Sequence, residues 1–316
     1  MNHGIPAFFV VERLPGVVAV AGSGGKLPEL PLTMITGYAA GGSTDLQGRV
    51  LATVLEEQLG QKITVSNIPG AGGAASASML ASSIEQGYVF QFGGSSVVSI
   101  APLLSPASYD PDSFTYVAGL SLEQPAFVTG SKRGIQDWPG LLAYLRATPG
   151  QIYVSQAAED RLIIRALAKR EGLELRTVPT SGGAGMAPLV LSGDAVFAYS
   201  GGTHPGYTES GEMRVLASLA DTRLLDYPDA PTLRELGYDL GLHTMRIVMV
   251  PANTPAEQVE ILADALAVAA KAPRFIEVTE QRIRQPVLFM RGDEIKPMLV
   301  RQMQEDRTLI DDIGLQ

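Results

Sequence analysis

The chain has 316 residues, of which 46% are apolar and 18% charged, and its formal net charge at pH 7 is −9. This length suffices for two lobes or one large α/β domain, and the apolar content is that of a globular chain. The acidic balance, without any cluster of lysine and arginine, argues against nucleic acid as a partner. The absence of cysteine excludes disulfides and thiolate chemistry.

Residues 1–27 read as a possible signal or leader remnant. Ala19-Val20-Ala21 has the small-x-small form of a cleavage site, and apolar stretches precede it. Glu12 and Arg13 split these stretches, and a basic segment ahead of them is missing, which is atypical of an export signal. An export signal, a degenerate signal, an added leader and a mis-assigned start therefore all remain open. No apolar run reaches the roughly 20 residues that a membrane-spanning helix needs.

The stretch 34–59 predicts a binding loop. A short buried strand (32–36) runs into the Gly41-Gly42 turn, and Ser43 or Thr44 is a natural N-cap for the helix that follows. A glycine turn before a helix N-terminus presents free N–H groups, which attract carboxylate, sulfate or phosphate. The same residues also fit an ordinary strand-to-helix turn. Apolar residues at helical spacing predict the buried face of this helix: Leu46, Val50, Val54 and Leu59.

Two further predicted strands, 62–67 and 88–92, also end in loops of glycine and hydroxyl residues, at 70–76 and 93–96. In open parallel sheets, ligands bind outside the carboxyl ends of the strands, so three such loops predict one binding edge. Residues 70–75 also match the G-x-G-x-x-A pattern of dinucleotide sites. Pro69 interrupts that pattern, and no acidic residue follows the next strand to hold a ribose, so the match is weak.

The block 126–242 repeats the same order of strand, glycine loop and helix and predicts a second α/β lobe. We therefore expect two lobes, one formed by 28–125 plus 243–316 and the other by 126–242, each a mostly parallel sheet flanked by helices. In the C-terminal part, Thr254-Pro255-Ala256-Glu257 predicts a capping box that opens a helix to about Lys271. The segment 293–313 predicts another helix, and both helices are expected to pack on the first lobe.

Catalytic signatures are missing. The three histidines, His3, His204 and His243, lack a second ligand at helical spacing, so no metal site is expected. G-x-S-x-G is absent, and the carboxylates are expected mostly on solvated helix faces. Two lobes with polar glycine loops and no catalytic constellation favour a binding protein that needs no cofactor.

Six segments, in order, resemble the signatures of the substrate-binding component of tripartite tricarboxylate transporters, the Bug family. They are Y-A-A-G-G-S-T-D-L-Q-G-R (38–49), N-I-P-G-A-G-G (67–73), Q-G-Y-V-F-Q-F-G (86–93), V-P-T-S-G-G-A-G-M-A-P-L-V-L-S-G-D-A-V-F (178–197), Y-P-D-A-P-T-L-R-E-L-G-Y-D (227–239) and V-P-A-N-T-P-A-E (250–257). The resemblance covers about 30–312. It implies a type II periplasmic-binding-protein fold with two α/β lobes hinged around a ligand cleft. It also implies a periplasmic location, a small mono- or dicarboxylate ligand and membrane transporter subunits as partners; we expect a monomer.

The resemblance also implies ligand-binding residues in both lobes. Ser43 and Thr44 would donate hydroxyl and backbone N–H groups to one carboxylate, and the second lobe would close over it. Neutral donors at helix N-termini can hold an anion in this way. The implied set is Tyr38, Ala40, Gly42, Ser43, Thr44, Gly72, Ser95, Ser96, Ser155, Gln156, Gly182, Gly183 and Arg246.

Three departures from the family pattern put the usual ligand in doubt. Residues 155–160 read S-Q-A-A-E-D where relatives have S-x-G-x-G-S/T and a histidine, and the two added acids would oppose a second carboxylate. Thr180-Ser181 replaces the usual tyrosine and its neighbour. Met245-Arg246 stands where relatives often have an aromatic residue. Arg246 would pair with a ligand anion if it faces the cleft, or it is a surface arginine at the start of a strand.

The leading hypothesis is a solute-binding protein that closes on a small carboxylate and delivers it to a transporter. A sensory subunit that signals to a membrane kinase would have the same lobes, and the sequence does not separate the two. An NAD(P)-dependent enzyme, based on residues 70–75, is the alternative from another class.

Overall fold

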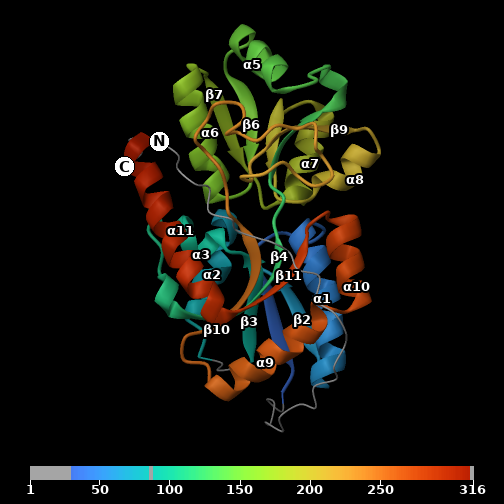
Figure 1. Ribbon diagram of the computed structural model, residues 1–316, viewed down its shortest axis with the longest axis vertical. Coiled ribbons are helices and arrows are strands. Elements are labelled where there is room, and N and C mark those ends of the chain that lie inside the picture. The colour runs from blue at the N-terminus through green and yellow to red at the C-terminus, as the bar shows by residue number, and fades with distance from the viewer. Residues whose placement is uncertain (1–29, 85–87, 314–316) are drawn as a thin grey trace, which may run out of the picture.

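The computed structural model describes residues 30–84 and 88–313, so the possible leader at 1–27 lies outside the described residues. Two β-sheets lie one above the other in Figure 1, each flanked by helices. We call the six-stranded sheet and its helices the first lobe, and the five-stranded sheet and its helices the second lobe.

The sheet of the first lobe has the strand order β11-β4-β10-β3-β1-β2. Its strands are β1 (Leu32–Thr36), β2 (Ile63–Asn67), β3 (Val89–Gly94), β4 (Phe114–Leu122), β10 (Met245–Pro251) and β11 (Val287–Arg291). β1 pairs in parallel with both β2 and β3. The carboxyl ends of these three strands therefore meet at one edge, as the glycine loops predict.

The sheet of the second lobe has the order β7-β6-β8-β5-β9. Its strands are β5 (Ala126–Gly130), β6 (Gln151–Ser155), β7 (Leu175–Pro179), β8 (Phe197–Ser200) and β9 (Met213–Ser218). β6 pairs in parallel with β7 and β8, whereas β5 is antiparallel to both of its neighbours.

The two sheets are mixed rather than mostly parallel. β10 enters the first lobe from the second and runs antiparallel to β3 and β4, and β11 is antiparallel to β4. The reversal of β10 thus follows from the return of the chain from the second lobe. β11 is also a strand that the sequence analysis did not predict.

The helices divide between the lobes. The first lobe carries α1 (Ser43–Leu59), η1 (Ala71–Gly73), α2 (Ala74–Ala81), α3 (Ser96–Ser99), α4 (Ala101–Leu104), η2 (Pro111–Ser113), α9 (Ala256–Ala269), α10 (Pro273–Ile276), η4 (Glu277–Arg282) and α11 (Gly292–Ile313). The second lobe carries η3 (Ser131–Arg133), α5 (Trp138–Ala147), α6 (Ala158–Glu171), α7 (Gly183–Ser192) and α8 (His204–Glu209). As expected, α9 and α11 contact the first sheet at β4. No helix in the described part of the chain is long and apolar enough to span a membrane.

The start and the buried face of α1 differ from the prediction. The N-cap is Gly42, and neither Ser43 nor Thr44 occupies that position. The helix packs on the sheet through Gly48, where a Cβ would lie 3.3 Å from the Phe92 ring. The buried face therefore follows Gly48, and Leu46, at 36% exposure, lies outside it. Val54 and Leu59 are buried as predicted.

The predicted capping box at the start of α9 is wrong. Pro255 is the N-cap, and the buried Thr254 hydroxyl has no hydrogen-bond partner among the described residues. Thr254 instead donates its backbone N–H to the Pro251 carbonyl at 3.0 Å. A turn that follows β10 thus takes the place of the cap.

Apolar side chains form a core on both faces of each sheet. In the first lobe one cluster includes Leu51, Leu55, Phe90 and Phe92, and the opposite face includes Ile35, Met249 and Ile295. A smaller cluster joins the lobes, because Ile100, Leu162 of α6 and Ile310 of α11 pack together. In Figure 1, α11 accordingly rises along the first lobe to the side of α6.

Candidate functional site

The polar residues of interest gather where the chain crosses between the lobes. One crossing follows β4 at Glu123, and another enters β10 at Thr244. The two are tied together, because Glu123 N–H donates to the Thr244 carbonyl at 3.0 Å. Ser95 is tied to the second crossing: its N–H donates to the Met245 carbonyl at 2.8 Å, and its hydroxyl accepts from Met245 N–H at 3.2 Å.

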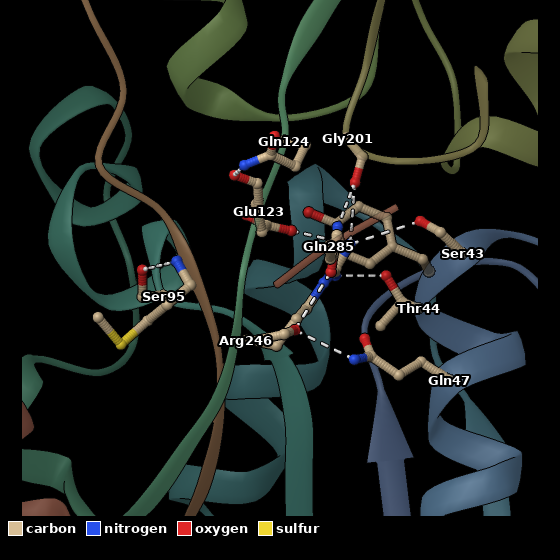
Figure 2. Close-up of polar contacts among 12 residues, drawn as sticks. Ser43, Thr44, Gln47, Ser95, Glu123, Gln124, Gly201, Arg246 and Gln285 are labelled. Atoms are coloured by element: carbon tan, nitrogen blue, oxygen red, sulfur yellow. Dashed lines mark hydrogen bonds and ion pairs between the residues drawn. The ribbon is translucent and has the colours of Figure 1, made fainter. Parts of the chain in front are cut away.

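Arg246 lies at the centre of this region and is only 3% exposed. Its guanidinium pairs with Glu123 at 2.8 Å and donates to the Thr44 hydroxyl. Longer contacts reach the Ser43 hydroxyl at 3.5 Å and the Gly201 carbonyl at 3.4 Å. Figure 2 shows the guanidinium between the crossing segment and the start of α1. The alternative of a surface arginine is wrong, since β10 is an interior strand and its first residues are covered on both sides.

A chain of amides and hydroxyls connects α1 to the second lobe. Gln47 donates to the Ser121 hydroxyl at 3.1 Å, and Ser121 donates to Gln285 Oε1 at 3.2 Å. Gln285 Nε2 then donates to the Gly201 carbonyl at 3.1 Å. The Gly201 carbonyl in the second lobe thus receives donors from two first-lobe residues, which Figure 2 draws as converging dashed lines.

The loop between β1 and α1 is held by Asp45. Its carboxylate accepts from Gly41 N–H at 2.9 Å, from Asn67 Nδ2 at 2.9 Å and from Arg49 Nε at 3.0 Å. Although burial opposes ionisation, these hydrogen bonds hold the pKa of Asp45 below its usual value. The loop is therefore fixed by its own residues, and Ala40 within it is exposed.

The lobes meet directly at the predicted glycines. A Cβ on Gly72 would lie 2.9 Å from Ala157 Cα, and a Cβ on Gly42 would lie 3.9 Å from Gly183 N. The Tyr38 ring packs on Gly182, and the Tyr38 hydroxyl donates to the Gly72 carbonyl at 3.3 Å. At Gly72 a side chain is excluded by the backbone of the other lobe, whereas Gly183 has no room for a Cβ because Thr203 of its own lobe lies there. Nearby, Ala39 N–H donates to the Ser181 carbonyl at 2.9 Å.

On the second lobe, Asp160 organises the loop that departs from the family pattern. Its carboxylate accepts from Tyr153 Oη at 2.7 Å, from Ala157 N–H at 2.7 Å and from Gln156 N–H at 3.2 Å. Burial raises the pKa of Asp160 to about 6, and the hydrogen bonds from Tyr153 and Ala157 limit the rise. The Gln156 side chain donates to the Tyr199 carbonyl. Asp160 therefore supports the start of α6.

Glu159, the neighbouring acid, faces the first lobe. It is 3% exposed and lies one helical turn before Leu162, which packs on Ile100 of the first lobe. Burial, followed by the charges of Asp160 and Glu123, raises the pKa of Glu159 to about 8. Burial and then the charges of Glu159 and Glu123 raise the pKa of both Tyr38 and Tyr199.

The structure thus brings most of the predicted residues to one interface. We call Ser43, Thr44, Ser96, Glu123, Glu159 and Arg246 the interlobe polar cluster. Tyr38, Gly42, Gly72, Gly182 and Gly183 surround it as lobe contacts. Ser95, Ser155 and Gln156 mainly hold the backbone, and Ala40 contributes no contact.

Sequence reasoning missed Glu123, Tyr199, Gly201 and Gln285. It also expected carboxylates mostly on solvated faces, whereas Glu123, Glu159 and Asp160 are buried. One signal was present, because Glu123 is a lone charge inside the apolar stretch from Val117 to Val128. No group of three or more acidic or histidine side chains that could hold a metal occurs in 30–84 and 88–313.

Two mixed α/β sheets joined by crossing segments, with polar side chains gathered at the crossing, define the fold of a periplasmic binding protein. Solved structures agree with this fold. MatC from Rhodopseudomonas palustris with bound malate superposes with a TM-score of 0.81 at 20% identity, covering 90% of this chain and all of that one. Rpa4515 of R. palustris with adipate gives 0.83 at 22% identity, covering 92% and 99%.

The chain belongs to the tripartite tricarboxylate transporter family of receptors, whose model matches residues 48–315. A UPF0065 protein of Bordetella bronchiseptica is 31% identical, with 83% of this chain and 84% of that protein covered. Protein BugT of Bordetella pertussis is 29% identical, with 86% of each covered. The resemblance to this family is therefore confirmed. Since its members are transporter receptors, the alternative of an NAD(P)-dependent enzyme is wrong.

Proposed function

We propose that this protein is a periplasmic receptor that binds a small mono- or dicarboxylate between its lobes, 28–125 plus 243–316 and 126–242. It delivers this ligand to the membrane subunits of a tripartite tricarboxylate transporter. Closure of the lobes on the ligand performs the work, and no covalent chemistry is involved. The malate and adipate bound to the two structural relatives support this class of ligand.

The observation that carries the proposal is the position of Arg246. Its guanidinium reaches the Thr44 hydroxyl at the first turn of the 17-residue helix α1. A helix N-terminus and a guanidinium both favour an anion, and the guanidinium can offer a carboxylate a planar set of donors. The second lobe approaches the same place, since the Gly201 carbonyl lies 3.4 Å from Arg246. A carboxylate held here would therefore contact both lobes.

A thermal-shift screen of the full chain tests this function. The panel contains malate, succinate, glutarate, adipate and the ω-amino acids of matching length. A ligand at 100 times its dissociation constant should stabilise the protein by roughly 2.7 kcal/mol. A flat response to every carboxylate in the panel would contradict the proposal.

The placement of the ligand is tested by the double substitution Ser43→Ala with Thr44→Ala. We expect at least about tenfold weaker binding of the panel's best ligand, equivalent to about 1.4 kcal/mol. Thr53→Ala is the matched control, because Thr53 is an exposed hydroxyl of the same helix that donates to the Arg49 carbonyl. Unchanged affinity in the double variant would show that the ligand lies elsewhere.

A further inference from the structure

The interlobe polar cluster contains more acidic side chains than basic ones. Arg246 is its one cation, and Glu123 already pairs with it at 2.8 Å. Glu159 adds a second carboxylate from the opposite lobe. Within 30–84 and 88–313, no lysine or arginine lies within ion-pair distance of Glu159. Without such a partner, burial raises the pKa of Glu159 to about 8, so at pH 7 this acid holds a proton.

The contrast with Asp160 shows that Glu159 is not a structural acid of the same kind. Asp160 accepts hydrogen bonds from the Tyr153 hydroxyl and from the N–H groups of Gln156 and Ala157, so its oxygens are used within the second lobe. Glu159 lies one helical turn before Leu162 of α6, and Leu162 packs on Ile100 of the first lobe. The Glu159 side chain is therefore on the face of α6 that meets the first lobe.

We propose that the ligand of this receptor carries a cationic group, such as an ammonium, that pairs with Glu159, in addition to the carboxylate held near Arg246. The inference rests on the proposed function and names its ligand class: a small zwitterion rather than a dicarboxylate. An ammonium beside Glu159 can replace the proton that this acid holds and can donate to the carboxylate oxygens. The second carboxylate of a dicarboxylate would instead lie near Glu123 and would oppose ionisation of Glu159, in surroundings that screen charge poorly.

The surrounding hydroxyls fit such a group. The Tyr38 hydroxyl of the first lobe donates to the Gly72 carbonyl at 3.3 Å, and Gly72 lies against the start of α6. The Tyr199 hydroxyl of the second lobe would lie 3.4 Å from a Cβ on Gly201, whose carbonyl Arg246 reaches. Tyrosine hydroxyls can accept as well as donate, so both lobes offer neutral acceptors to an ammonium at this junction.

The test compares pairs of probes that differ in one end group. Succinate and β-alanine, glutarate and 4-aminobutyrate, and adipate and 5-aminovalerate have matched lengths, and their dissociation constants for the full chain are measured by isothermal titration calorimetry. We expect the ω-amino acid of the best-fitting pair to bind at least tenfold more tightly than its dicarboxylate. In Glu159→Gln the preference should shrink to less than threefold or reverse, because the isosteric amide keeps the size of the side chain but cannot ionise.

Asp306→Asn is the matched control. Asp306 is also a buried carboxylate, and it accepts a hydrogen bond from Gln302 at 2.9 Å, but it lies on α11 outside the interlobe polar cluster. This variant should keep the preference of the unmodified protein. The comparison in the unmodified protein stands by itself if a variant does not fold.

The outcomes separate the two proposals. Tighter binding of the ω-amino acids, lost in Glu159→Gln, supports both. Tighter binding of dicarboxylates would overturn the inference and leave the proposed function standing. An equal preference in Glu159→Gln and the unmodified protein would also overturn it. Binding of neither series would contradict the proposed function itself.

Discussion

Arg246 and Glu123 form an ion pair that is almost completely shielded from solvent, with side chains 3% and 5% exposed. Removing two charges from water is costly, and their attraction offsets this cost only while both partners are present. The hydroxyls of Thr44 and Ser43 and the Gly201 carbonyl supply further hydrogen-bond partners for the guanidinium. The pair therefore fixes the orientation of the arginine at the start of α1, and breaking it leaves an isolated buried charge.

Arg246→Met should for this reason destabilise the protein by about 3–5 kcal/mol, since Glu123 is left buried without its cation. Adding Glu123→Gln should restore at least about half of the loss, because the double variant has no unpaired charge. Urea unfolding of the single and double variants measures both effects.

The control is Arg223→Met, which breaks the exposed pair with Glu235 at 2.9 Å. An exposed pair contributes about 0–1 kcal/mol. A loss in Arg246→Met no larger than that of Arg223→Met would show that the buried pair does not behave as a unit.

At the scale of the elements, the loops after the parallel strands make the contact between the lobes. Gly72 follows β2 with φ +66°, and the backbone of Ala157 at the start of α6 lies against it. Gly60, which ends α1, has the same φ of +66° but no atom within 4 Å of a Cβ placed there. The two glycines thus share a backbone conformation and differ in what surrounds them.

Gly60→Ala and Gly72→Ala separate backbone strain from contact between the lobes. Each should lower the free energy of unfolding by about 1 kcal/mol, the cost of a side chain at positive φ. Only Gly72→Ala should weaken ligand binding, by at least about tenfold, because its methyl group opposes the approach of Ala157. Calorimetric titration with the best ligand of the panel measures this, and an equal effect of both variants on affinity would refute the role of Gly72.

Most strands and the binding edge could be predicted from sequence, because apolar runs bounded by glycine are a local signal. β1 occupies the predicted 32–36, and the three glycine loops lie at one edge of the first sheet. The buried face of α1 was predicted wrongly because it is set by the contact of Gly48 with the Phe92 ring, a tertiary contact that helical spacing does not reveal. β11 was missed because it is an edge strand of half-buried residues next to the predicted C-terminal helix.

Local sequence patterns could not predict how the charged residues of the site are arranged. Glu123 and Arg246 are 123 positions apart, and Glu159 comes from the other lobe, so only the crossing of the chain brings them together. The family motifs predicted where residues lie in the structure better than what those residues do. Gly72 and Gly182, for example, lie at the predicted edge, yet in the structure they are contacts between backbone and backbone or ring.

At the scale of the whole molecule, two buried titratable groups, Glu159 and His204, make the free energy of unfolding depend on pH in opposite directions. The pKa of Glu159 is raised from 4.5 to about 8, mainly by burial. The folded protein therefore holds a proton that the unfolded chain has released, and this stabilisation is complete below pH 4.5 and lost as the pH rises through 8. Burial lowers the pKa of His204 from 6.5 to about 3, so its contribution is present above pH 6.5 and lost on acidification.

In the window from pH 7 to 8.5 Glu159 dominates, because His204 is mostly neutral in both states there and the pKa values of Asp160 and Asp306 are about 6. The free energy of unfolding should fall with pH, by up to about 1.4 kcal/mol per unit. Urea unfolding at several pH values measures the slope. In Glu159→Gln the slope should largely disappear, and a slope that persisted in this variant would assign the titration to another group.

The lobes are also joined by direct hydrogen bonds and packing contacts that need no ligand. The Gly201 carbonyl accepts from Gln285 and Arg246, and Leu162 packs with Ile100 and Ile310. These contacts favour a closed arrangement of the lobes whether or not a solute is bound. The larger the fraction of unbound molecules that are already closed, the lower the apparent dissociation constant. Unloaded receptors in the same state would then compete with loaded ones for the transporter. If the receptor delivers its ligand to membrane subunits as proposed, these subunits would have to distinguish loaded from unloaded receptors by a feature other than the closeness of the lobes.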